Sequence, residues 1–178
     1  GTWHYSDSWT FASGIVDGWD KFDPVVNRAA YLGGVVYTPE HEKYTVALSL
    51  ITGDEDGAAP PVEGNRTMYS LVFSWNINES TQYVAQHDHG IQSNAAGGTS
   101  EWYGLNQYLF YTINDCWKAG LRGEWFRDDD GTRVAGFRPG NNTPGGHSGH
   151  FYQITAGLNW TPTTNLTVRP ECRWDWFD

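Results

Sequence analysis

The sequence has no apolar run that approaches the roughly 18 residues of a transmembrane helix, which excludes a helical membrane protein. It holds only two cysteines, Cys116 and Cys172, too few for a disulfide framework. Lysine and arginine number 11 against 21 acidic residues, and the net charge of −10 argues against nucleic acid or an anionic membrane surface as a partner. Since no nucleophile elbow, phosphate-binding loop or paired-carboxylate motif stands out, we expect no enzyme activity and no cofactor.

Aromatic rings are abundant in an otherwise hydrophilic chain. The 178 residues include 10 Trp, 10 Tyr and 8 Phe, yet the mean hydropathy is −0.56. A transmembrane β-barrel reconciles these two values, because alternation dilutes its apolar residues and its rings gather in two interfacial girdles. A soluble secreted β-sandwich that binds carbohydrate through its aromatics is the competing interpretation.

Apolar and polar side chains alternate with a period of two, which is typical of β-strands. The alternation is clean over residues 43–52, 67–77, 116–126, 152–160 and 165–176. Weaker strand signals cover residues 2–12, 28–38, 80–89 and 101–114. These segments predict an all-β protein of about nine strands. Pro170 falls on the apolar side of the last segment and cannot donate a ladder hydrogen bond, so we expect a bulge or local irregularity there.

The predicted connections alternate in length along the chain. Long links cover residues 13–27, 53–66, 90–100 and 128–149. Short links lie near residues 39–42, 78–79, 114–115 and 162–164. Up-and-down outer-membrane barrels have short periplasmic turns and long extracellular loops, whereas Greek-key sandwiches have no reason to alternate. The predicted fold is therefore an antiparallel up-and-down transmembrane β-barrel in the outer membrane of a Gram-negative bacterium.

The strand count suggests that this barrel is incomplete. About nine strands are predicted, whereas bacterial single-chain barrels have an even number. The last predicted strand also runs outward and ends at Asp178. We therefore expect residues 1–178 to form one barrel segment that lacks further strands after residue 178.

Three stretches carry a resemblance to a known family. They are GLRGEWFRDDDGTR at residues 120–133, NLTVRPECRWDW at residues 165–176 and EWYGLNQY at residues 101–108. All three resemble strand-and-loop segments of the OmpL-like β-barrel porins of Gram-negative and related bacteria. The resemblance implies a porin-like outer-membrane protein, not an enzyme, and a family whose complete members continue past residue 178.

Charged residues gather on the polar side of two late segments. They are Lys118, Arg122, Glu124, Arg169, Glu171 and Arg173. In a barrel that side faces the lumen, where charges of both signs select solutes by charge and size. We predict that these six residues line a pore for passive diffusion of small hydrophilic solutes, and salt bridges that stiffen the wall are compatible with that role. A non-conducting barrel that serves as a surface scaffold or attachment partner is the alternative.

No metal site is predicted from the acidic runs or the histidines. The runs at residues 54–57 and 128–131 lack the spacing of an EF-hand loop, so plain solvated loops are expected. His87 and His89 share one face of a strand but have no identifiable third ligand.

The remaining predictions concern the cysteines and the partners. Cys116 and Cys172 should differ in height by roughly 20 Å at the rise of a β-strand, too far for a disulfide, with both thiols facing lipid. The expected partners are outer-membrane lipid or lipopolysaccharide and small hydrophilic solutes. A second copy of the chain or another envelope protein is left open as a further partner.

Overall fold

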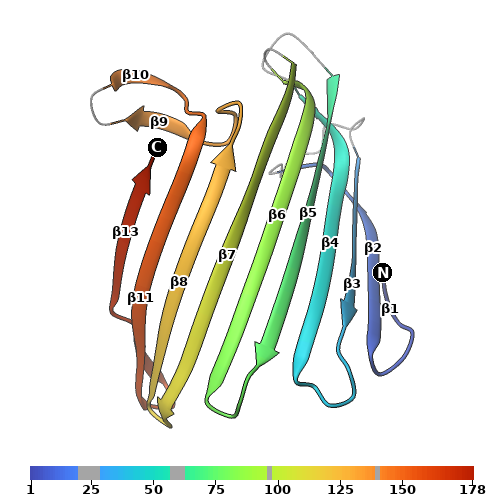
Figure 1. The fold of residues 1–178 in the computed structure, drawn as a ribbon. Coiled ribbons are helices and arrows are strands. Elements are labelled where there is room, and N and C mark those ends of the chain that lie inside the picture. Colours follow the sequence, from blue (N-terminus) through green and yellow to red (C-terminus); the bar gives the residue numbers. More distant parts are fainter. Residues whose placement is uncertain (20–28, 57–62, 96–97, 139–140) are drawn as a thin grey trace.

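The computed structural model describes residues 1–19, 29–56, 63–95, 98–138 and 141–178, and these residues form β-strands joined by turns (Figure 1). The strands are β1 (Thr2–His4), β2 (Trp9–Val16), β3 (Ala30–Tyr37), β4 (Tyr44–Asp56), β5 (Glu63–Asn76), β6 (Thr81–Ala95), β7 (Gly98–Asn114), β8 (Trp117–Asp128), β9 (Ala135–Arg138), β10 (Asn141–Gly146), β11 (Gly149–Thr163), β12 (Leu166–Val168) and β13 (Glu171–Phe177). Among the described residues, no helix is long and apolar enough to cross a membrane.

One antiparallel sheet holds eleven of these strands, and its strand order is the chain order (Figure 1). It runs from β1 through β8 to β11, which pairs with both β12 and β13, while β9 and β10 form a separate hairpin. This is the predicted all-β, up-and-down arrangement. In the part of the chain that the structure describes, β1 pairs with neither β12 nor β13, so the sheet is open between its two edges.

The strand register separates the side chains into two faces. We call outer the face that carries Leu48, Leu71, Leu121 and Ile154, because cross-strand partners share a face. These four leucine and isoleucine side chains are each between 41% and 50% exposed. Ala30 and Trp102 are the only buried hydrophobic residues among those described, so the apolar side chains cover an open surface rather than fill a core.

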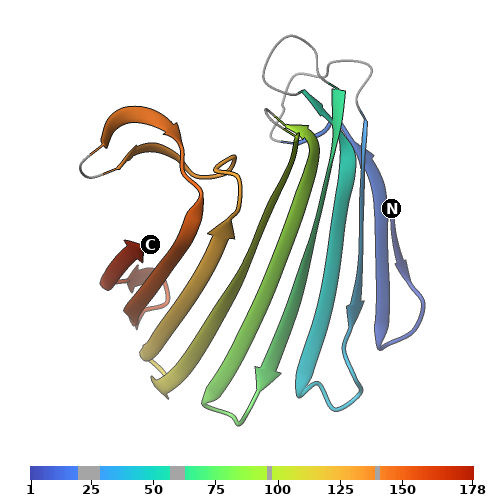
Figure 2. The same cartoon turned by 45° about the horizontal axis from the view of Figure 1, so that its top comes forward.

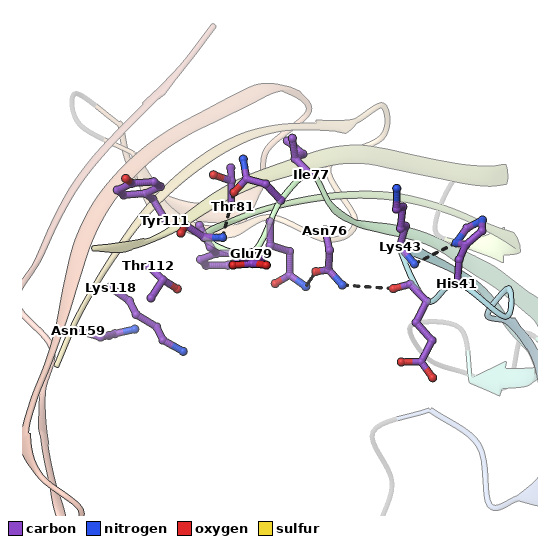
Figure 3. A pocket seen from close by; sticks show the side chains of 15 residues that line it. His41, Lys43, Asn76, Ile77, Glu79, Thr81, Tyr111, Thr112, Lys118 and Asn159 are labelled. Atoms are coloured by element: carbon purple, nitrogen blue, oxygen red, sulfur yellow. Dashed lines mark hydrogen bonds between the residues drawn. The ribbon is translucent and has the colours of Figure 1, made fainter. Parts of the chain in front are cut away.

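The opposite face, which we call inner, lies on the concave side of the sheet. Figure 3 shows Lys118, Thr112 and Asn159 pointing to the inner side of the curve, and Tyr111 to the outer side. A hollow of about 1160 Å³ lies on the inner side at the end of the sheet that carries the short turns, here the turn end. The opposite end, which carries the β9–β10 hairpin, is the loop end (Figure 2).

Several predicted segment boundaries are wrong. Residues 2–12 are not one strand, because a turn at Tyr5–Ser8 separates β1 from β2 and is closed by the Tyr5 amide, which donates to the Trp9 carbonyl at 3.0 Å. Ser6, Asp7 and Ser8 favour such a turn. The sheet consequently has ten strand positions among the described residues, with β12 and β13 sharing one, instead of nine.

The predicted long links also start too early or end too late, because β2 runs to Val16, β4 runs to Asp56 and β5 begins at Glu63. The discrepancy is largest at the predicted link over residues 90–100. Strand β6 continues to Ala95 and β7 begins at Gly98, while residues 96–97 lie outside the described residues. The hydrogen-bonded ladder therefore continues through a polar sequence in which hydrophobic alternation has faded. Parts of the other long links, residues 20–28, 57–62 and 139–140, are likewise not described.

Pro170 interrupts the last strand, as predicted, but produces no bulge. Trp160 pairs with Val168 on one side of the interruption, and Gly157 pairs with Glu171 on the other, in the same register. The Pro170 carbonyl still accepts from the Leu158 amide at 3.1 Å, so only the missing proline N–H breaks the ladder. Nearby, Cys172 lies opposite Ala156 on the outer face, and Cys172 and Cys116 are both free and exposed.

Candidate functional site

On the inner face of β6, β7, β8, β11 and β13, side chains form rows that run across the strands. Such rows arise because partners in an antiparallel register lie opposite one another. The middle row consists of Gln86, Asn106, Glu124, Gln153 and Asp175. The lower row, two residues nearer the turn end, consists of Val84, Tyr108, Arg122, Thr155 and Arg173. The upper row, nearer the loop end, consists of Asp88, Gly104, Phe126, Phe151 and Phe177.

Arginines of the lower row form ion pairs with carboxylates of the middle row on the same strand. Arg122 pairs with Glu124 on β8, and Arg173 Nη2 lies 2.6 Å from Asp175 Oδ1 on β13. Residues two apart on a strand share a face, which places each guanidinium beside its carboxylate. Arg122 also donates to Asn106 Oδ1 at 3.2 Å, and its guanidinium lies over the Tyr108 ring at 5.6 Å.

Gln153 connects the two ion pairs. Its side chain lies between β8 and β13 and is only 5% exposed. In the amide orientation that gives both terminal atoms complementary partners, Nε2 donates to Glu124 Oε2 at 2.8 Å and Oε1 accepts from Arg173 Nε at 3.0 Å. The result is one polar network that runs across three strands from Arg122 to Asp175.

The six residues predicted as pore-lining share the inner face but fall into two groups. Arg122, Glu124 and Arg173 belong to the polar network. Lys118, Glu171 and Arg169 lie nearer the turn end: Lys118 opposite Asn159, Glu171 opposite Gly157, and Arg169 in the Pro170 interruption, where the unchanged register places it opposite Asn159 as well. Among the described residues, neither Lys118 nor Arg169 makes an ion pair.

Asn106, Gln153 and Asp175 were missed as site residues by sequence reasoning. The signal for Asp175 was present in the sequence, because Arg122 and Arg173 are each followed two residues later by a carboxylate on the same face. Gln153 and Asn106 had no such signal, since their role depends on the register that sets both of them opposite Glu124.

The prediction that Asp128 belongs to a plain solvated loop is wrong. Its side chain is fully buried, and its carboxylate accepts three backbone N–H bonds, from Thr132 at 3.1 Å, Arg133 at 2.7 Å and Val134 at 2.8 Å. Gly131, with φ of 67°, lets the chain fold back over it. This carboxylate thus holds a turn together, which we call the Asp128 turn (residues 128–134). Its oxygens are occupied by backbone N–H groups of that turn.

The Asp128 turn brings a side chain onto the inner wall. Arg133 lies with its guanidinium 5.0 Å from the centre of the Trp102 ring. Trp102 is 3% exposed and lies flat across β6 at Gly90, where a methyl group would overlap the indole. The indole of Trp102 and the guanidinium of Arg133 above it therefore occupy space on the inner side at the loop end.

The histidine pair and the other acidic run form no metal centre in the part of the chain that the structure describes, where no three metal-ligating side chains cluster. His89 Nε2 instead lies 2.7 Å from Glu101 Oε1, and its ring meets Tyr69 and Tyr103 on the outer face. In the run at residues 54–57, Asp54 is exposed, and the side chains of residues 55–57 lie outside the described ones.

Comparison with known proteins identifies the family of this chain. The family model described as "Putative beta-barrel porin-2, OmpL-like" matches residues 1–178. The chain belongs to this family. No curated protein and no solved structure matches the OmpL-like chain.

Two bands of aromatic rings lie on the outer face of this OmpL-like porin. Near the turn end, Trp9 and Tyr37 lie 4.6 Å apart and Trp117 stacks on Trp160 at 5.6 Å. At the loop end, the rings in contact are Tyr69, His89, Tyr103, Trp125, His150, Tyr152 and Trp176. Two such bands are what the girdles of a transmembrane β-barrel predict. They bracket the open apolar surface from both sides.

Proposed function

We propose that this protein is a porin-like channel of the bacterial outer membrane, through which small hydrophilic solutes diffuse passively. The observation that carries the proposal is the division of one curved sheet into an exposed apolar outer face and an ion-paired inner face. An apolar surface bracketed by two aromatic bands is suited to hydrocarbon between two interfaces. A polar wall on the concave side is suited to water, which the lumen of a channel supplies.

Five of the six residues predicted to line the pore have one of two roles in that channel. Arg122, Glu124 and Arg173 are held in the polar network, which restricts their side chains and so keeps the width of the passage constant. Lys118 lines the hollow at the turn end, and Arg169 lies opposite Asn159, which lines the same hollow. Neither cation makes an ion pair among the described residues, so both supply charge that a passing ion would meet there.

Lipid is the proposed partner of the outer face. A groove of about 550 Å³ on this face has Leu109, Leu121, Ala156, Leu158 and Cys172 among its lining residues. Its apolar lining is suited to an acyl chain of outer-membrane lipid or lipopolysaccharide. Headgroups at the levels of the two bands of rings would then lie above and below this groove.

Planar-bilayer recording of the full-length protein tests the channel. Discrete conductance steps are expected, and Arg169→Gln should shift the reversal potential in a salt gradient toward cation preference because it removes an unpaired cation from the lumen. Arg127→Gln, which removes a cation from the outer face, is the matched control and should leave the reversal potential unchanged. A complete absence of steps would overturn the channel and favour the non-conducting scaffold.

A further inference from the structure

The polar network on the inner wall is electrically balanced. Each arginine of the lower row faces one carboxylate of the middle row, Arg122 with Glu124 and Arg173 with Asp175. A solute of either sign that approaches this wall meets one attractive and one repulsive group. Charge therefore gives a solute little advantage at this height of the wall.

The same network is rich in directional hydrogen-bonding groups. Guanidinium, carboxylate and amide groups stand within two adjacent rows, and the Arg173–Asp175 pair remains 55% and 54% exposed. Arginine offers only donors and a carboxylate only acceptors, so a neutral group that both donates and accepts can satisfy either one. Hydroxyl groups have this property.

Apolar rings border the network toward the loop end. Phe126, Phe151 and Phe177 form a continuous row, with ring centres 6.3 Å and 6.4 Å apart. Phe177 is 44% exposed. An aromatic face favours a flat apolar partner, such as the C–H face of a pyranose ring.

The rings and the network meet in one hollow of about 350 Å³. Its lining includes Glu124, Gln153, Arg173, Asp175, Phe126, Phe151, Phe177 and Val134. Small-molecule sites commonly measure about 300–1,000 Å³ and combine apolar walls with a few convergent polar groups. The hollow is thus apolar on one side and densely hydrogen-bonding on the other.

We propose that this hollow binds a neutral sugar, which makes sugars the preferred solutes of the channel. The proposal rests on the channel function proposed above and names its substrate class. The C–H face of the sugar lies against the phenylalanine row, and its hydroxyl groups bond to Arg173, Asp175 and Glu124. A phosphate or carboxylate on the solute would meet the acidic groups as well as the guanidinium of Arg173, and an amine would meet that guanidinium as well as the acidic groups, so neither charge gains an advantage.

The experiment measures interruption of single-channel current in planar bilayers that contain the full-length protein. Glucose and maltotriose are the neutral probes, and gluconate and glucosamine are the charged controls. We expect concentration-dependent current block by the neutral sugars at lower concentrations than by either control. Equal block by all four probes, or no block by the sugars, would overturn the sugar site while leaving the channel intact.

Two substitutions locate the block in the hollow. Asp175→Asn and Phe151→Ala should each weaken the block by maltotriose roughly tenfold, through loss of a charge-assisted hydrogen bond and of a ring contact. Phe73→Ala removes the same ring from the outer face and should leave the block unchanged. Phe151→Leu preserves most of the side-chain volume and covers the case in which the alanine variant fails to fold. Unchanged block in both Phe151→Leu and Asp175→Asn would overturn the assignment.

A protein that forms no conductance steps would refute the channel, and the site is then tested alone. Calorimetric titration of the detergent-solubilised full-length protein with maltotriose should show saturable heat that Asp175→Asn diminishes. Absence of that heat would overturn the sugar site independently of the channel.

Discussion

The inner wall differs between the two halves of the sheet. Along β2 to β5 it carries small or aliphatic uncharged side chains, among them Ala12, Gly34, Ala47 and Ser49, up to the level of Arg66. Along β6 to β13 it carries ion pairs, amides and aromatic rings. Because the larger and charged side chains stand on β6 to β13, most of the open space on the inner side lies next to β2 to β5. In the proposed channel, a solute would meet charged and aromatic groups on the second half of the sheet and small uncharged groups on the first.

The largest expected difference between the halves concerns a pair of inner-face glycines. Gly90→Ala should destabilise the folded protein by about 3 kcal/mol, because the added methyl overlaps the buried Trp102 ring. Gly14→Ala on β2 meets nothing within 4 Å and should change stability by less than about 0.5 kcal/mol. Urea unfolding of both variants in detergent micelles measures the difference. Equal stability of the Gly90→Ala and Gly14→Ala variants would contradict the close packing of Trp102 on Gly90.

A second comparison concerns acidic residues at the loop end of the two halves. Asp128→Ala should cost about 2 kcal/mol, because three backbone N–H groups lose their acceptor. Asp54→Ala, at the end of β4, removes an exposed carboxylate and should cost less than about 0.5 kcal/mol. Unfolding in urea, together with faster proteolysis within the Asp128 turn, reports the change. Unaltered proteolysis would mean that the turn holds without its carboxylate.

The smallest expected effect concerns the balance of charge on the second half. Asp175→Asn leaves Arg173 unpaired and should move ion preference slightly toward anions. The double variant Arg173→Gln with Asp175→Asn should return the preference to that of the parent protein. Reversal potentials in a salt gradient provide the readout. A double variant that stays shifted would contradict the pairing as the source of neutrality.

Most strands of the sheet can be predicted from the sequence because their outer face is apolar and their inner face is not. Tyr69, Leu71, Phe73 and Trp75 alternate with polar or smaller residues, and all four lie on the outer face of β5 as predicted. The upper parts of β6 and β7 escaped prediction for a physical reason. Where neither face of a strand needs to be apolar, the backbone hydrogen bonds continue and the hydrophobic period disappears.

The inner wall was only partly predictable. Arg122, Glu124 and Arg173 were found through their charge and their side of the strand, and the register places them on one face. The up-and-down order predicts that β11 lies between β8 and β13, but the bridging role of Gln153 also depends on the register that sets it opposite Glu124 and Asp175, which no local pattern contains. The burial of Asp128 was hidden for a similar reason, since a run of three aspartates has the composition of a solvated loop.

The Trp102 ring lying across Gly90 has a consequence for how the protein assembles. Slipping β7 by one residue against β6 would place His89 or Ile91, instead of glycine, opposite the indole, and would turn every side chain of β7 to the other face. The close fit of ring and glycine therefore favours the native register of β6 and β7 over the shifted one.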